Sequence, residues 1–124
     1  MIYCLDVEVV IDINRRYTNN GGRVRDRSGL ESALARPMQT WGGQDLYSTA
    51  VGKAAALLHG LATTQCFVDG NKRTAWISCT VFLAGMDLYF KPVDNIADEF
   101  VVAIAEKRMS QSEAGIWILD NLDM

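Results

Sequence analysis

The chain has 124 residues, of which 49% are hydrophobic, and a formal net charge of −3. This size and apolar content predict a single domain over residues 1–124 with one modest core, and they exclude a chain that is disordered over most of its length. The acidic balance argues against direct nucleic-acid binding, which usually requires a basic excess.

The first predicted elements are two helices separated by a loop. Asp6 has a side chain suited to capping a helix that ends near Tyr17, and an Asn- and Gly-rich stretch then forms the loop. Ser28, with Glu31 three residues later, has the spacing of a capping box for a short second helix. Pro37 is expected to stop that helix.

The next segment precedes the most apolar part of the chain. Within residues 39–47 two glycines separate aromatic and apolar positions, which fits a small β-hairpin flap or an irregular loop. Its aromatic residues, Trp41 and Tyr47, are expected in the core, with a contact role on such a flap as the alternative. Ser48 is predicted to cap a central, buried helix over residues 49–64. The apolar positions of this helix repeat at helical spacing: Val51, Ala54, Ala55, Leu58 and Ala62.

Three further helices are predicted in the second half of the chain. The first runs from about residue 71 to 84 and ends at Gly85, and the second runs from about 94 to 106. The last begins at Ser110 and is expected to face inward through Ile116, Leu119 and Leu122. The sum is an all-α bundle of about six helices with at most one hairpin.

The chain shows no signal for a membrane or for an oxidising compartment. No apolar run approaches the roughly 20 residues of a membrane-spanning helix, and the N-terminal stretch lacks the features of a secretory signal. Cys4, Cys66 and Cys79 form no CxxC pair, and the chain has one histidine, which makes a zinc site improbable. We therefore expect free thiols and a cytoplasmic protein.

The stretch TQCFVDGNKRTAW, residues 64–76, joins two predicted helices and combines features of an anion site. The N-terminus of a helix presents unpaired N–H groups and about half a positive charge. Gly70 permits close approach of the backbone to a ligand, and Lys72 and Arg73 add two cations. Asp69 fits such a site if Mg²⁺ bridges its carboxylate to phosphate oxygens.

A simpler interpretation of the same residues remains open. DGN is a common turn sequence, so Asp69 would merely cap the following helix while Lys72 and Arg73 extend into solvent. The spacing alone does not decide between a phosphate site and this turn.

The stretch resembles the signature of the Fic/Doc family, H-x-F-x-D/E-G/A-N-K/G-R. Every fixed position except the first agrees, without a gap: Gln65, Phe67, Asp69, Gly70, Asn71, Lys72 and Arg73. The flanking segments GLESALARP, KAAALLHGLA and TAW also resemble this family. The resemblance extends over roughly residues 30–122 and implies a compact helical bundle, and the short length is similar to the Doc (death-on-curing) toxin branch.

The resemblance implies a reaction with ATP. Fic proteins transfer AMP to hydroxyl groups, and their motif has glycine in place of Lys72 and a second arginine in place of Trp76. Both departures resemble Doc, which implies transfer of the γ-phosphate to a Ser or Thr hydroxyl of a target protein. The implied target is elongation factor Tu, whose modification inhibits translation and growth, and the implied inhibitor is a Phd-like antitoxin.

The same resemblance implies roles for individual residues. Asp69 would hold Mg²⁺, and the catalytic set would be Gln65, Asp69 and Arg73. The phosphate-binding set would be Gly70, Asn71, Lys72 and Arg73. Residues 39–47 fall where the family has a flap that receives the target peptide as an added strand.

Gln65 departs from the family pattern at its most important position. The family has a histidine there, which takes the proton from the attacking hydroxyl. An amide is not basic near neutral pH, whereas histidine titrates near 6.5. This chain is therefore expected to be inactive or strongly impaired while it retains ATP binding, whether the glutamine is natural or introduced. His59 lies six residues earlier and is expected to be structural.

Two alternatives compete with a phosphotransferase. An AMP-transferase would use the same motif, although Lys72 argues against it. A catalytically inactive protein of the same fold would bind only nucleotide or an antitoxin helix. A helical DNA-binding domain is disfavoured by the acidic balance.

Overall fold

The computed structural model describes residues 4–92 and 94–124. In chain order its elements are α1 (Val7–Tyr17), α2 (Arg27–Ala35), the 3₁₀ helix η1 (Arg36–Met38), β1 (Thr40–Trp41), β2 (Gln44–Asp45), α3 (Ala50–Thr64), α4 (Asn71–Ala84), α5 (Asp94–Ala105) and α6 (Gln111–Asn121). The predicted all-α bundle with one short hairpin is confirmed. None of the helices in these ranges combines the length and apolar character that a membrane crossing needs.

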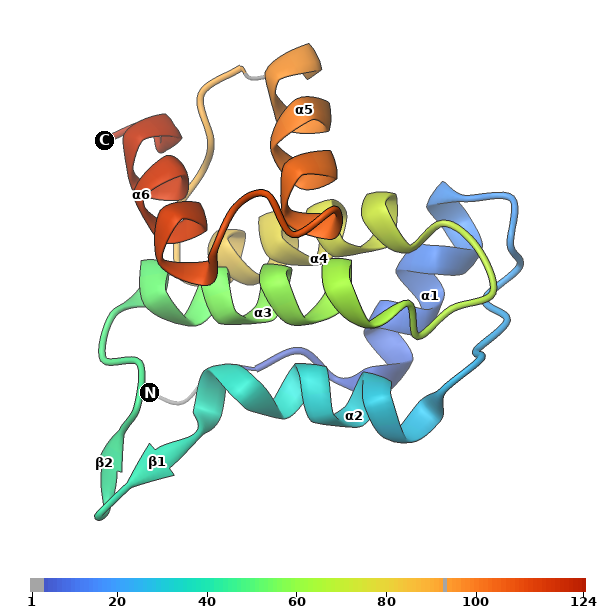
Figure 1. The fold of residues 1–124 in the computed structure, drawn as a ribbon, viewed down its shortest axis with the longest axis horizontal. Coiled ribbons are helices and arrows are strands. Elements are labelled where there is room, and N and C mark those ends of the chain that lie inside the picture. Colours follow the sequence, from blue (N-terminus) through green and yellow to red (C-terminus); the bar gives the residue numbers. More distant parts are fainter. Residues whose placement is uncertain (1–3, 93) are drawn as a thin grey trace.

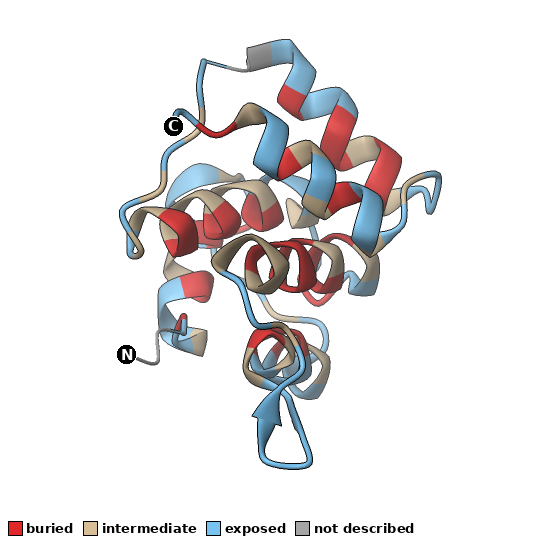
Figure 2. Ribbon diagram, turned by 90° about the vertical axis from the view of Figure 1, so that its left-hand side faces the viewer, coloured by how far each residue is buried: buried red, intermediate tan, exposed pale blue. Residues whose placement is uncertain are grey.

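Helix α3 occupies the centre of the bundle and contacts α2, α4, α5 and α6 (Figure 1). Buried residues gather on the sides of the helices that face it (Figure 2). Close packing is possible because α3 is rich in small residues; at Gly60 a side chain would come within 3.4 Å of Ala33 on α2. The prediction of a central, buried helix is confirmed, although Val51 at its start is only partly buried.

The predicted starts of two helices need correction. Asp6 caps α1 as predicted, by accepting a hydrogen bond from the N–H of Glu8. Helix α2 begins after Asp26, not Ser28, and α3 begins after Thr49, not Ser48. At each start two side chains that can cap a helix lie within two residues of each other. The backbone conformation decides which of the two reaches the free N–H groups of the helix.

The inward face of α6 also differs from the prediction. Ile116 and Leu119 are 63% and 49% exposed. The buried residues follow a spacing of four instead of three: Ala114, Ile118 and Leu122. In this orientation α6 packs mainly against α3, and Trp117 stacks on Phe100 of α5 with ring centroids 3.8 Å apart.

The segment before α3 is a hairpin, not an irregular loop, because β1 and β2 pair antiparallel. Trp41 is 83% exposed, so the expectation that it lies in the core is wrong, and Tyr47 is only partly buried. The amine of Lys53 holds the hairpin to α3. It donates to the carbonyls of Pro37 and Tyr47 (3.3 and 2.7 Å) and lies 3.1 Å from the carboxylate of Asp45.

The hairpin lies at one end of α3, and the loop that carries the motif, residues 65–70, lies at the other (Figure 1). We call these residues the motif loop. The 15 residues of α3 separate the two features by about 22 Å along the helix axis. The hairpin therefore does not line the cavity that contains the motif residues.

Candidate functional site

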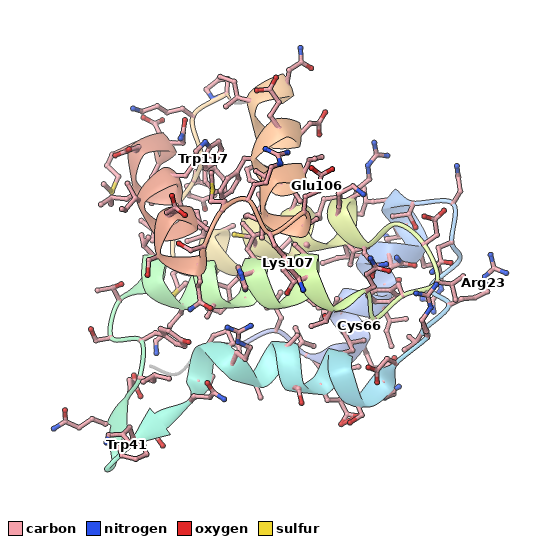
Figure 3. All side chains as sticks on the ribbon, viewed as in Figure 1. Arg23, Trp41, Cys66, Glu106, Lys107 and Trp117 are labelled. Atoms are coloured by element: carbon pink, nitrogen blue, oxygen red, sulfur yellow. The ribbon has the colours of Figure 1, made fainter. Side chains whose placement is uncertain are left out.

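The motif residues meet in one cavity between the C-terminal end of α3, the N-terminal end of α4 and the side of α5. The cavity has a volume of about 610 Å³, which is within the usual range for a small-molecule site. All predicted site residues line it: Gln65, Asp69, Gly70, Asn71, Lys72 and Arg73. In Figure 3, Cys66 marks the adjoining loop and Trp41 marks the hairpin at the opposite end of the molecule.

The start of α4 lines the cavity and has the features that favour anions at a helix end. Gly70 is the residue before the helix, and the first helical hydrogen bond runs from the N–H of Thr74 to its carbonyl (2.9 Å). The N–H groups of the first three helical residues, 71–73, therefore point out of the helix end. Such an end attracts anions, phosphate above all.

Gly70 is required at this position for two independent reasons. Its φ of +76° lies in the left-handed region, which most side chains disfavour. In addition, a Cβ atom on Gly70 would lie 2.6 Å from Cγ2 and 2.7 Å from Cβ of Thr18. The chain thus passes so close to the end of α1 that only glycine fits.

Three charged side chains surround this helix end, and all are exposed. Asp69 accepts a hydrogen bond from the N–H of Gly70 through Oδ1 (2.8 Å), and it does not cap α4, whose preceding residue is Gly70. Arg73 donates to the carbonyl of Tyr17 (3.3 Å). Lys72 forms no ion pair with any described residue, so its amine is available to a ligand.

Asn71 shapes the loop from within. Its Oδ1 accepts from the N–H of Phe67 and its Nδ2 donates to the carbonyl of the same residue, both at 2.9 Å. Phe67 itself is 1% exposed and anchors the loop in the core. The amide of Asn71 is thereby committed to the main chain, which makes it a part of the frame and leaves the cations and N–H groups to meet the ligand.

Gln65 ends α3 and lines the cavity with an exposed side chain. Its backbone is left-handed, with φ +49° and ψ +51°. The amide can donate and accept hydrogen bonds but cannot take up a proton near neutral pH. The side chain therefore offers the cavity a hydrogen-bonding group that is not a base.

Sequence reasoning did not identify the residues of α5 that close the cavity. These are Asp98, Val101, Val102 and Ala105. Trp76 and Ile77 of α4 complete an apolar wall beside the cations. The spacing of the α5 residues is typical of one helical face, but nothing local indicates that this face meets the motif loop.

The donors in the cavity fit a metal that arrives with a phosphate ligand. Asp69 and Asp98 are its two carboxylates, and no group of three or more metal-binding side chains occurs among the described residues. Mg²⁺ typically binds through one or two carboxylates together with substrate phosphates. The site therefore suits Mg²⁺ bound to a nucleotide better than a permanently held ion.

The cysteines do not contribute a nucleophile. Burial raises the pKa of Cys66, which lies 3.0 Å from Oγ1 of Thr64. Complete burial raises the pKa of Cys79 to about 12. Both thiols therefore stay protonated at neutral pH and behave as small core residues. The described cysteines are all free, as expected.

His59 does not line the cavity. Its Nδ1 is buried without a hydrogen-bond partner among the described residues. Burial and, to a smaller extent, the positive charge of Arg36 lower its pKa. It borders a separate hollow with Lys107, Arg108 and Glu113.

The lowered pKa of His59 predicts a loss of stability at mildly acidic pH. The unfolded chain takes up a proton near pH 6.5, whereas the folded protein resists it, so stability should fall as the pH drops below about 6.5. Urea unfolding at several pH values should show this decline, and His59→Gln should reduce it. An equal decline in both proteins would assign it to other groups.

Two sequence comparisons bear on this arrangement. Residues 4–83 match the profile of the Fic/DOC family. Toxin Doc of Mycolicibacterium smegmatis (strain ATCC 700084 / mc(2)155) is 51% identical over 61 residues, which are 49% of this chain and 47% of that protein. The aligned region thus spans about half the length of this relative.

Proposed function

This chain belongs to the Fic/DOC family, and from that premise we propose that it is a Doc-type toxin of a toxin–antitoxin system. Its cavity would transfer the γ-phosphate of ATP to a Ser or Thr hydroxyl of a target protein. The observation that carries the proposal is the convergence of the α4 N-terminus, two cations and Asp69 on one cavity of nucleotide size.

Each group has a role that suits phosphoryl transfer. This reaction depends mainly on positioning and on neutralising charge, with little covalent help from the protein. Lys72, Arg73 and the N–H groups at the start of α4 would bind phosphate oxygens. Asp69 would hold Mg²⁺, which when bound neutralises charge on the phosphates. The apolar wall around Trp76 offers space for the rest of the nucleotide.

Gln65 limits what this chain achieves with that ligand. Without a base, the target hydroxyl keeps its proton, so we propose a protein that binds Mg-ATP and transfers phosphate slowly. The proposal further includes a Phd-like antitoxin as partner, elongation factor Tu as target and a cytoplasmic location. Family membership and the similarity to Toxin Doc support the antitoxin partner.

Binding of Mg-ATP tests the proposal directly. Calorimetry should show saturable binding to the unaltered chain, and Lys72→Ala should weaken it about tenfold, because a charge-assisted contact is lost. Asp69→Asn should weaken binding in the presence of Mg²⁺ and have less effect on ATP alone. Lys91→Ala removes an exposed cation that does not line the cavity and serves as the matched control. We call Asp69, Lys72, Arg73 and the N–H groups at the start of α4 the phosphate cradle. Absence of heat with Mg-ATP, or an equal loss of affinity in the control, would refute it.

A further inference from the structure

Asn14 is a polar residue of α1 that is completely buried behind the motif loop. Its Nδ2 donates to the carbonyl of Asp69, 55 residues later, at 3.1 Å and to Oγ1 of Thr74 at 3.0 Å. Its Oδ1 accepts from Nδ2 of Asn20 at 2.8 Å and from the N–H of Gly22 at 3.0 Å. All four hydrogen-bonding positions of the amide are thereby used, as burial of such a group demands.

The two donated bonds hold both sides of the α4 N-terminus. The carbonyl of Asp69 belongs to the same peptide unit as the N–H of Gly70, and that N–H in turn binds the Asp69 carboxylate. Thr74 makes the first helical hydrogen bond of α4. Asn14 therefore fixes the direction of the Asp69–Gly70 peptide relative to the first turn of the helix, and with it the direction of the carboxylate.

The loop that follows α1 supports the motif loop from the same side. We call residues 18–26 the brace loop. Its main chain bonds to the motif loop through the N–H of Val68 to Arg23 (3.1 Å) and the N–H of Arg25 to Cys66 (2.7 Å). The accepted bonds of Asn14, from residues 20 and 22, come from this brace loop. Asn14 is thus the side chain through which α1, the brace loop and the start of α4 are joined.

We propose that Asn14 is a positioning residue for the phosphate cradle, acting through the Asp69 carbonyl and the Thr74 hydroxyl. The proposal rests on the proposed function, in which the cradle holds the phosphates of Mg-ATP. It goes beyond a general contribution to folding because it requires that the direction of two hydrogen bonds, and not burial alone, sets ligand affinity. It also assigns a role in the site to a residue that lies outside the cavity and far from the motif in sequence.

The test measures the affinity for inorganic triphosphate with Mg²⁺ by calorimetry. This ligand lacks the adenine and ribose of ATP, so its affinity reports on the phosphate cradle alone. Asn14→Leu keeps the approximate volume and removes all four bonds, and should weaken binding at least about tenfold. Ile118→Ala truncates a fully buried side chain on α6, away from the cradle, and serves as a control of comparable instability. At a temperature where both variants are folded, this control should bind within about twofold of the unaltered chain.

A second pair of variants keeps the proposal testable if Asn14→Leu does not fold. Thr74→Val retains the shape of the side chain but removes the hydroxyl that accepts from Asn14, whereas Thr74→Ser retains the hydroxyl and removes a methyl group. Affinity should fall about threefold in the first and stay unchanged in the second. Equal affinity in Asn14→Leu, or equal losses in the Thr74 pair, would overturn the positioning role. If the unaltered chain itself fails to bind triphosphate and Mg-ATP, the proposed function fails instead.

Discussion

Replacement of Gln65 by histidine is expected to raise the rate of ATP-dependent transfer to a protein hydroxyl by about 10²–10⁴-fold. The side chain lines the cavity that holds Asp69 and the cations, and histidine would supply the base that glutamine lacks. The substitution should not strain the chain, because the left-handed backbone at this position is one in which histidine is enriched among non-glycine residues. The rate should rise through the titration of the new histidine, near pH 6.5.

Mass spectrometry of a lysate incubated with ATP and the Gln65→His protein measures this change and identifies the group that is transferred. An added phosphate supports the proposed kinase activity, and an added AMP would establish the AMP-transferase instead. Gln65→Asn serves as the control, since it changes the side chain without adding a base. If restoring the histidine yields neither modification nor growth arrest on induction, the chain is an interaction protein of the same fold.

Gly70→Ala is expected to abolish Mg-ATP binding and to lower the melting temperature by about 10 °C or more. The left-handed φ costs alanine roughly 1–2 kcal/mol, and the clash with Thr18 adds about 1–3 kcal/mol of overpacking. The loop can relieve the clash only by moving away from α1, which displaces the N–H groups and the Asp69 carboxylate. Thermal melts and calorimetry measure the two effects.

Gly42 in the hairpin provides the matched control for this substitution. It has a similar φ of +59°, but a Cβ there would have no neighbour within 4 Å. Gly42→Ala should therefore show the backbone cost alone, with Mg-ATP binding retained. If Gly70→Ala loses no more stability than Gly42→Ala and still binds Mg-ATP, the close approach to Thr18 is not what shapes the cradle.

The sequence predicts that the motif residues lie together because their positions are local. Gly70, Lys72 and Arg73 lie within one turn of a helix start, so their spacing alone places them together, as found in the cavity. Helix boundaries are also local signals, and those of α1 and α4 agree with prediction. The errors at Ser28 and Ser48 arise where neighbouring side chains compete to cap the same N–H groups.

The rest depends on contacts between elements that no local pattern specifies. The buried face of α6 depends on its packing against α3, and the α5 wall of the cavity depends on how α5 packs beside the motif. Asn14 illustrates the point most clearly. It follows the apolar residues of α1 at helical spacing, so the pattern cannot distinguish a polar residue that faces solvent from one that is buried and fully hydrogen-bonded.

The bond between Asn14 and Asp69 has a consequence for what the signature means in other chains. The nine motif residues, 65–73, are contiguous in the sequence. Their conformation nevertheless depends on α1, whose Asn14 lies more than fifty residues before Asp69. A peptide cut out around the signature would keep the motif sequence but lose the contact with α1 that shapes it. A rearranged gene that loses α1 would have the same result. During synthesis, the site can form only after α4 has been made and α1 has packed against it, which requires the closure of a long loop.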